Sequence, residues 1–456
     1  MLKGGIATFF LSIRQDSPEQ ASYLVMEGIS ECIADLCVTV QAVSGKACAF
    51  DVSSQAPGLV LASLAVQRMP PSRPSIPMFL LDAVMLDLEK PLRQQGLVSG
   101  CNVTYVLRAA SEEDVKCLEQ KVGRKQKIDL RDQLFWTTLR WLSLARLPSL
   151  PLPGNLRSLR FEDEFNESLE YVLLPSLLRR LTFGARFNQS LASVSLPKAL
   201  RRLTFGRSFN RSLDETLLPS SLRCLTFGFS FNRSLEKVSL PSQLRSLTFH
   251  GVFDQSLEDV WLPNKLRSLT LGCDFNQSLE KVSLPKSLRN LTIGGEFNQS
   301  LEKVSLPSKL RSLTFWGMGF NQSLDRVSLP SRLQSLQFSG GFNQSLEKVS
   351  LPSQLQSLVF GHDFNQSLEK VVLPSRLRHL VFGECFDQSL EKVSLPSTLR
   401  TLTFGRGFNQ SLEKVSIPSM LRRLNLHSPT QCDALLETGS LPVGCSLYEG
   451  EAHLSG

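Results

Sequence analysis

The sequence lacks the features that mark membrane-spanning and disulfide-stabilised proteins. No uninterrupted apolar run approaches the ~20 residues that a transmembrane helix needs, so we expect no membrane segment. The 10 cysteines follow no regular spacing, and only Cys224, Cys273 and Cys385 fall in the repeated part of the chain. A disulfide or zinc framework requires regular spacing, so reduced thiols in a cytoplasmic or nuclear protein are expected.

Catalytic motifs are also missing from the sequence. The five histidines are His250, His362, His379, His427 and His453. They are scattered, and none has a second ligand at a spacing typical of metal sites. Neither a glycine-rich phosphate loop nor a nucleophile elbow is found. We therefore predict a protein that is not an enzyme and that uses no metal and no cofactor.

The most prominent feature of the sequence is an internal repeat. Phenylalanines recur every 22 residues from Phe165 to Phe297 and again from Phe320 to Phe408, with one step of 23 between the two runs. A proline keeps the same period from Pro153 to Pro418, which gives twelve full repeats. Such periodicity is the signature of a solenoid in which each coil stacks only on its neighbours. The sequence therefore predicts a mainly β protein with a solenoid over residues 136–428.

Each repeat predicts two short strands. Within residues 301–315, apolar and polar residues alternate near 303–306 and again near 312–315, which is the period of a strand with one buried face. Pro307 separates the two because proline has no N–H to donate. A glycine often follows the second strand and is expected to give the next turn a positive φ. These glycines are Gly184, Gly206, Gly228, Gly272, Gly294, Gly361, Gly383 and Gly405.

Stacked coils place equivalent residues in columns, and one column is asparagine. Short polar side chains bond to backbone groups in turns, so we predict an internal ladder rather than a ligand site. Its members include Asn188, Asn210, Asn232, Asn276, Asn298 and Asn321. Ten of the twelve Phe-Asn or Phe-Asp pairs continue as Asn-x-Ser, a glycan acceptor in the secretory pathway. A glycan in a stacked ladder would prevent stacking, which favours an intracellular location.

Charged columns suggest where a partner binds. An acidic column lies beside a lysine column, and the two are expected to compensate each other. A separate basic column contains Arg201, Arg223, Arg245, Arg267, Arg289 and Arg311. Two outward faces are candidates for protein binding: the rows of Lys303 and Ser305, or the rows of Ser312 and Thr314. The arginine column offers an alternative, binding of nucleic acid or another acidic ligand, although aromatic residues suited to stacking on bases are absent from the expected outer positions. A purely structural role is a third interpretation.

Two stretches connect the repeat to known families. "LPSKLRSLTFGxxFNQSL" resembles the FNIP-type repeat of the leucine-rich-repeat superfamily, through its Leu-Pro, Leu-x-x-Leu and Phe-Asn landmarks. "LEKVSLPSKLRSL" followed by Phe is also similar to BspA-type leucine-rich repeats. Members of this superfamily serve chiefly as protein-recognition scaffolds, so the resemblance implies a protein partner.

The segment before the repeats has a different pattern. It predicts strands near 38–42, 48–52, 78–81 and 103–107, a turn at 44–46 and a helix that starts at Pro57. The "SGK" turn and "PLRQQGLVSGCNVTYVLR" resemble the first hairpin and the closing segment of ubiquitin-like domains, which have an α+β fold called a β-grasp. The chain continues without a terminal Gly-Gly, which implies a built-in module that is not conjugated.

The ubiquitin resemblance also implies partners. It places Val43, Leu80 and Val106 at the apolar recognition patch and suggests ubiquitin receptors or proteasome-linked factors, although the three residues are equally consistent with ordinary sheet positions. The expected organisation is an unassigned segment 1–36, a β-grasp domain 37–108, a helical linker 109–135, the solenoid 136–428 and a C-terminal cap 429–456. The predicted function is a non-catalytic interaction scaffold of undetermined oligomeric state.

Overall fold

The protein is described by a computed structural model. The structure describes residues 10–11, 24–25, 36–42, 47–52, 61, 65, 75–81, 84–86, 91–95, 97, 102–109, 140–147, 152, 154–437 and 441–449. The chain divides into two compact units. The first contains residues 1–228 and 237–241, and the second contains residues 229–236 and 242–456. The segments 1–36 and 109–135 of the expected organisation lie almost wholly outside the described residues.

The N-terminal part of the first unit contains a five-stranded mixed sheet. Its strands are β3 (Leu36–Ala42), β4 (Ala47–Val52), β5 (Ser75–Leu81), β6 (Val84–Met85) and β7 (Asn102–Ala109), in the order β4-β3-β7-β5-β6. Strand β3 pairs antiparallel with β4 and parallel with β7. A short 3-10 helix, η1 (Leu92–Gln95), precedes β7, and the short strands β1 (Phe10–Leu11) and β2 (Leu24–Val25) pair with each other.

The remainder of the first unit is a stack of coils that each contribute one short strand. These strands are β8 (Trp141–Leu144), β9 (Ser158–Phe161), β10 (Arg180–Thr182), β11 (Arg202–Thr204) and β12 (Cys224–Phe227). From β9 onward the parallel register joins residues one repeat apart, such as Leu181 with Leu203 and Leu203 with Leu225. Equivalent residues therefore lie in columns.

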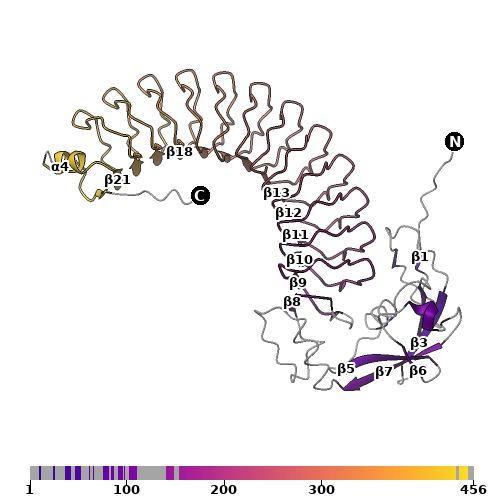
Figure 1. Cartoon of the computed structure of the whole chain (residues 1–456). Helices are drawn as coiled ribbons and strands as arrows, with labels where there is room; N and C mark the ends of the chain where they lie inside the picture. Colours follow the sequence, from indigo (N-terminus) through magenta and orange to yellow (C-terminus); the bar gives the residue numbers. More distant parts are fainter. Residues whose placement is uncertain are drawn as a thin grey trace. The chain divides into compact units, whose positions relative to one another are not determined.

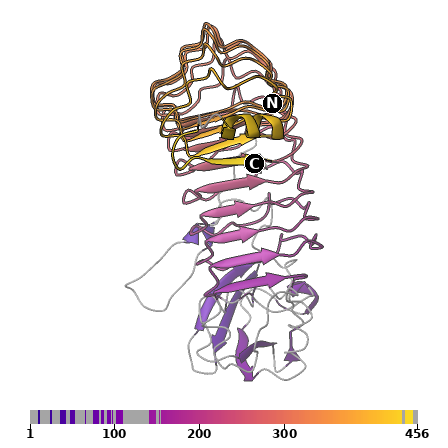
Figure 2. The same ribbon diagram turned by 90° about the vertical axis from the view of Figure 1, so that its left-hand side faces the viewer.

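The second unit continues the same pattern. Its strands are β13 (Ser246–Phe249), β14 (Ser268–Thr270), β15 (Asn290–Ile293), β16 (Ser312–Phe315), β17 (Ser335–Phe338), β18 (Ser357–Val359), β19 (His379–Val381), β20 (Thr401–Thr403), β21 (Arg423–Leu426) and β22 (Ser446–Glu449). They form a parallel sheet, and within this unit they line the inner edge of the arc of coils (Figure 1). Figure 2 shows the strands of the coils as parallel arrows. The predicted parallel β-solenoid is confirmed.

The core of each coil is built from leucine and phenylalanine. In strands β9–β19 and β21 buried side chains alternate with half-exposed or exposed ones, and leucines such as Leu313 and Leu336 are fully buried. Phenylalanines stack within a coil and between coils: the ring centroids of Phe360 and Phe364 are 3.8 Å apart, and those of Phe364 and Phe386 are 6.1 Å apart. The coils share this apolar interior, so one coil cannot bury its own core alone.

The C-terminal segment covers the end of the last coil. Helix α4 (Pro429–Glu437) contacts β21 and β22 and buries Cys432 and Leu435. Strand β22 pairs in parallel with β21 and extends the sheet by one strand. None of the helices described by the structure is long and apolar enough to cross a membrane.

The prediction of two strands per coil is wrong, because only the strand near 312–315 forms. In the segment 303–306 the backbone bonds locally instead: the Val304 N–H donates to the Leu301 carbonyl, and the Leu306 N–H donates to the Val304 carbonyl, both at 3.0 Å. Pro307, which follows, has no N–H. These tight turns consume donors that a second inter-coil ladder would need.

The predicted role of the glycines is also wrong. Among the glycines that the structure describes, positive φ occurs at Gly251, Gly317 and Gly444, none of which was expected. At Gly206, by contrast, a Cβ atom would lie 1.8 Å from the carbonyl oxygen of Gly184 in the preceding coil. At these glycines successive turns approach too closely for a side chain, and the backbone needs no unusual angle, whereas Glu162, His250, Trp316 and Ser339 take the equivalent place in other coils.

Candidate functional site

The strongest candidate surface in the second unit lies on the outward side of β13–β16, here called the strand face. Because side chains alternate across a strand, the leucines point into the core and small polar residues point out. The strand face consists of Ser246, Thr248, Ser268, Thr270, Thr292, Ser312 and Thr314, which are half-buried, and of the exposed Arg245, Arg267, Arg289 and Arg311, which precede the strands. It includes the predicted rows of Ser312 and Thr314.

The arginines of the strand face are held in register by their main chain. The Arg267 N–H donates to the Arg245 carbonyl, and the Arg311 N–H donates to the Arg289 carbonyl, at 2.8 and 2.7 Å. Their guanidinium groups form no ion pair and no side-chain hydrogen bond with any residue that the structure describes. Arg201 and Arg223 hold equivalent exposed places in the first unit. The strand face therefore carries a row of uncompensated positive charge.

The rows of Lys303 and Ser305 differ from the strand face, because most of their charges are already paired. Lys303 Nζ lies 3.0 Å from Glu280 Oε1 in the preceding coil, and the same inter-coil pair recurs between Lys281 and Glu258 at 2.6 Å. Four further pairs follow the same pattern: Arg326–Glu302, Lys370–Glu347, Lys392–Glu369 and Lys414–Glu391. The expected compensation between the two columns is thus confirmed, and little charge is left for a partner.

The hydrogen bond from Lys281 to Glu258, together with the negative charge of that carboxylate, raises the pKa of Lys281. Glu347 and Glu369 raise the pKa of Lys370 and Lys392 in the same way.

The row of Ser305 carries no continuous apolar surface. Ser305 is exposed, and the equivalent place of this serine in two other coils is taken by an apolar residue, Trp261 or Val372. They lie five repeats apart, so they form no continuous apolar patch.

The turns that follow the strands are where the coils differ most. The turn after β16 contains the extra residue of the repeat and carries two exposed apolar side chains, Trp316 and Met318, at 53% and 61% exposure. The place of Trp316 is taken by Gly294 and Ser339 in the coils on either side, and the place of Met318 is taken by Gly295 and Gly340. Trp316 also continues the outward alternation of Ser312 and Thr314, so it extends the carboxyl edge of the strand face.

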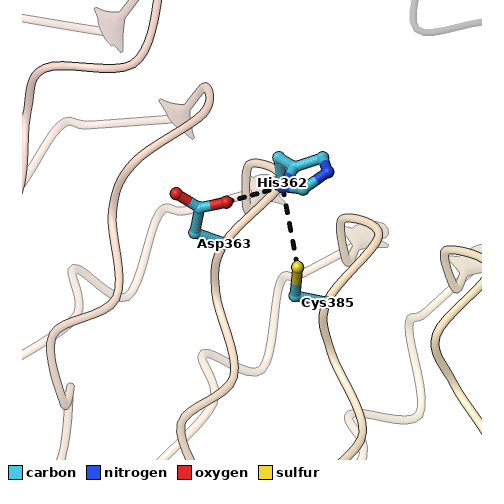
Figure 3. A group of neighbouring side chains, drawn as sticks. All are labelled: His362, Asp363 and Cys385. Carbon is cyan, nitrogen blue, oxygen red and sulfur yellow. Dashed lines mark hydrogen bonds and ion pairs between the residues drawn. The ribbon is translucent and has the colours of Figure 1, made fainter.

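A second group of side chains comes together in two other turns. His362 and Asp363 follow β18, Cys385 follows β19, and one ligand atom from each lies within 4.8 Å of the others (Figure 3). Spacing along the linear sequence does not reveal this group, because Asp363 and Cys385 are one repeat apart. Comparison of each residue with the residue one repeat later would have found it.

The predicted asparagine column forms hydrogen bonds between coils. Asn188 Oδ1 accepts the N–H of Asn210 at 3.0 Å, and Asn298 Oδ1 accepts the N–H of Asn321 at 3.1 Å. The side chains of Asn232, Asn276 and Asn321 accept in the same way from the next coil. The serine two residues later completes the turn, as where Ser300 Oγ accepts the Glu302 N–H. These polar groups therefore hold adjacent coils together.

The structure describes the backbone position of two of the three residues of the suggested apolar patch. Leu80 lies on β5 opposite Thr104, and Val106 lies on the neighbouring strand β7 opposite Met78. Val43 lies outside the described residues. The register thus brings Leu80 and Val106 onto adjacent antiparallel strands.

Comparisons with known proteins match the repeated part of the chain. The FNIP Repeat model matches residues 187–230, 231–274, 275–316, 320–363 and 364–407. The crystal structure of CroV588, described as a novel circular LRR protein, is 39% identical over 66% of this chain and 44% of that chain, with a TM-score of 0.58. The matched region thus spans less than half the length of CroV588. An internalin (InlF) from Listeria monocytogenes is 12% identical over 72% of this chain and 92% of its own, with a TM-score of 0.44. No curated protein matches.

Proposed function

We propose that this chain, whose residues 187–407 are FNIP repeats in a solenoid that resembles leucine-rich-repeat proteins, is a non-catalytic scaffold that binds an acidic protein segment along its strand face. The observation that carries the proposal is the contrast between two basic columns. The lysines pair with glutamates of the preceding coil, whereas the guanidinium groups of Arg245, Arg267, Arg289 and Arg311 pair with no described residue. Unpaired charge on a repetitive surface attracts a partner of opposite sign.

The chemistry of the strand face suits an extended polypeptide. Parallel strands lie about 4.8 Å apart, so the arginines recur at short intervals and one acidic segment reaches several of them. The rows of serine and threonine hydroxyls can both donate and accept hydrogen bonds, and they leave the backbone open to approach. Trp316, exposed at the carboxyl edge, supplies the large aromatic side chain that commonly anchors a protein interface.

Two matched triple variants of the full chain test this proposal. Arg267→Ser/Arg289→Ser/Arg311→Ser and Lys281→Ser/Lys303→Ser/Lys370→Ser each remove three positive charges, but only the first removes unpaired ones. The probe is a fluorescein-labelled oligo-glutamate peptide, followed by fluorescence polarisation. At about 0.5–1 kcal/mol for each exposed contact, the arginine variant should bind about 10- to 100-fold more weakly, with little change for the lysine variant. Equal losses in both variants would mean that net charge, and not the strand face, attracts the peptide.

Nucleic acid is the second candidate ligand, since the same arginines favour it. Single-stranded DNA or RNA bound in this way should show a steep linear fall of log affinity with log salt concentration. The strand face offers only Trp316 for base stacking, which favours the protein partner. Labelled oligonucleotides in the same assay distinguish the two, because tighter binding of DNA or RNA than of the peptide would replace the proposal. Absence of binding to every probe would support a structural role instead.

The N-terminal residues 37–108 are proposed to form a β-grasp module that recruits ubiquitin receptors or proteasome-linked factors. The parallel pairing of β3 with β7 at the centre of the sheet supports this, because the first and last strands of a β-grasp pair in that way. Leu61 and Ala65, which are helical, buried and one turn apart, support a helix packed on the sheet. Co-purification with the full chain should recover such factors, Leu80→Ala should lose them, and the lysine triple variant should keep them. Failure of the unmodified chain to recover any would contradict the recruitment role.

A cytoplasmic or nuclear location is part of the proposal. None of the six cysteines for which the structure gives a state is in a disulfide, which fits a reducing compartment. The asparagine side chains bond to the next coil, so a glycan on the Asn-x-Ser sites would disrupt the ladder. Imaging of the tagged chain, with a test for glycans on the secreted fraction, checks this directly.

A further inference from the structure

We propose that the turns after β18 and β19 form a binding site for one divalent transition-metal ion of the Zn²⁺ class, with His362, Asp363 and Cys385 as protein ligands. The three side chains converge on one point from two adjacent coils (Figure 3). They are the only group of this kind among the residues that the structure describes.

The distances suit a tetrahedral ion. Zn²⁺ bonds to nitrogen, oxygen and sulfur ligands at about 2.0–2.3 Å, so two ligands of one tetrahedral ion lie about 3.3–3.6 Å apart. His362 Nδ1 and Cys385 Sγ are 3.6 Å apart, within that range. Asp363 Oδ1 is 2.5 Å from the same nitrogen, a hydrogen-bond distance, and must move away by about 1 Å to share an ion with it. The carboxylate lies at the surface, so rotation of its side chain can supply this movement.

The main chain holds the two turns in place. The Cys385 N–H donates to the His362 carbonyl at 2.9 Å, and the Asp363 N–H donates to the Gly340 carbonyl at 3.0 Å. Gly383 permits the close approach, because a Cβ there would lie 1.9 Å from the Gly361 carbonyl oxygen. The ligands are therefore positioned by the stacking of rigid coils, which is what a preorganised metal site requires.

The arrangement fits a metal site better than a catalytic triad. In a Cys-His-Asp triad the acid and the nucleophile bond to opposite nitrogens of the imidazole. Here Asp363 and Cys385 both face Nδ1 of His362, so a proton shared with the carboxylate leaves that nitrogen unable to accept one from the thiol. Two ligands that face the same nitrogen can bind the same ion.

The ligand types select the metal. A thiolate, an imidazole and a carboxylate favour Zn²⁺ or Co²⁺ over Mg²⁺ and Ca²⁺, which prefer oxygen ligands. The side chains of His362 and Asp363 are about half exposed, at 53% and 43%. Three protein ligands at the surface leave a further coordination position that water can take, as in open zinc sites.

Metal titration of the full chain, purified reduced and metal-free, tests the proposal. Co²⁺ is followed through its thiolate charge-transfer band, and Zn²⁺ affinity is measured by competition with a chromophoric chelator. We expect the unmodified chain to give the thiolate band and to bind one more Zn²⁺ equivalent tightly than Cys385→Ser. His362→Ala should lose the band, and Asp363→Asn should weaken Zn²⁺ binding about tenfold or more, because it removes the ligand charge.

Cys273→Ser is the matched control, because Cys273 follows His250 by the same 23 residues that separate Cys385 from His362, yet among the residues that the structure describes Cys273 belongs to no group of three converging ligands. It should leave the band and the affinity unchanged, which separates the site from non-specific binding by other thiols. Circular dichroism checks that each variant is folded. The proposal is overturned if Cys385→Ser binds Zn²⁺ as the unmodified chain does, or if the unmodified chain gives no cobalt–thiolate band.

Discussion

The glycine column gives the sharpest test of how the coils pack. A glycine with ordinary φ is usually improved by alanine, which stabilises by about 0.4–1 kcal/mol through the unfolded state. At Gly294 we expect the opposite, because a Cβ would lie 1.4 Å from the Gly272 carbonyl oxygen and 2.4 Å from its carbon. Since a carbon and an oxygen normally stay more than 3 Å apart, the two coils would have to separate by well over 1 Å.

That separation weakens contacts on both sides of the turn. The inter-coil bond from the Leu271 N–H to the Thr292 carbonyl, 2.9 Å long, lies beside it, as does the stacking of Phe275 on Phe297. With about 1 kcal/mol for the hydrogen bond and 1–3 kcal/mol for forced repacking, Gly294→Ala should destabilise by about 2–4 kcal/mol. Urea unfolding followed by circular dichroism measures this, and hydrogen exchange should localise the opening to the neighbouring coils.

The adjacent Gly295 is the matched control. A Cβ there would meet its nearest atom, the Cys273 carbonyl oxygen, at 3.2 Å, so Gly295→Ala should change stability by no more than about 0.5 kcal/mol. A Cβ at Gly154 meets nothing within 4 Å, so Gly154→Ala should leave the stability of the protein unchanged or raise it slightly. If Gly294→Ala matched these two variants, close approach of the coils could not be the reason for the glycine column.

Three further predictions address the core, the ladder and pH. Phe364→Ala removes a fully buried ring stacked 3.8 Å from Phe360 and should cost about 3–5 kcal/mol in urea unfolding; a cost below about 1 kcal/mol would contradict a shared core. Asn298→Ala removes the acceptor for the Asn321 N–H and should cost about 1 kcal/mol, whereas Asn298→Asp should keep the bond, as Asp254 does for Asn276; equal losses would exclude the acceptor role. Burial, then the charges of Arg378 and Arg400, lowers the pKa of His379, so the unfolded chain binds more protons below about pH 6.5. Stability should therefore fall as pH falls through that range, and less so in His379→Gln, as thermal melts at several pH values would show.

The sequence was sufficient for the repeat and its register, because both follow from period alone. A strict step of 22 residues forces Leu313 to pair with its equivalents, and the strand at 312–315 is confirmed. The FNIP assignment is confirmed too. The second strand was not predictable from alternation, since Val304 and Leu306 are buried or half-buried whether their N–H groups bond across coils or within a turn. The alternation of apolar and polar residues shows which side chains face the core, but it does not show which acceptors the backbone N–H groups bond to.

The prediction of a positive φ for the glycine column was wrong for a related reason. A glycine after a strand is consistent with a positive φ and with a close approach, and sequence alone does not distinguish the two. Only the distance between Gly294 and Gly272 decides between them. The unexpected positive φ at Gly317 belongs to the coil with the extra residue, where the turn has to accommodate a longer chain.

Two groups of side chains distinguish individual coils, and both lie in the turns after the strands. One is Trp316 with Met318, and the other is His362 with Asp363 and Cys385. The packing of the coils explains this location. The strand requires leucine at its buried positions, the next position requires glycine where coils touch, and the asparagine and serine bond across or within turns. Most members of each column are alike because a change in one coil alters a contact with the next, although Glu162, His250, Trp316 and Ser339 stand in the glycine column. Beyond the glycine place the turn side chains, such as Met318, His362 and Cys385, are exposed, so they can vary while the stack persists. In a solenoid of this kind the chemical neighbour of a residue is the one in the next coil, and a functional group forms wherever two such turns supply compatible side chains.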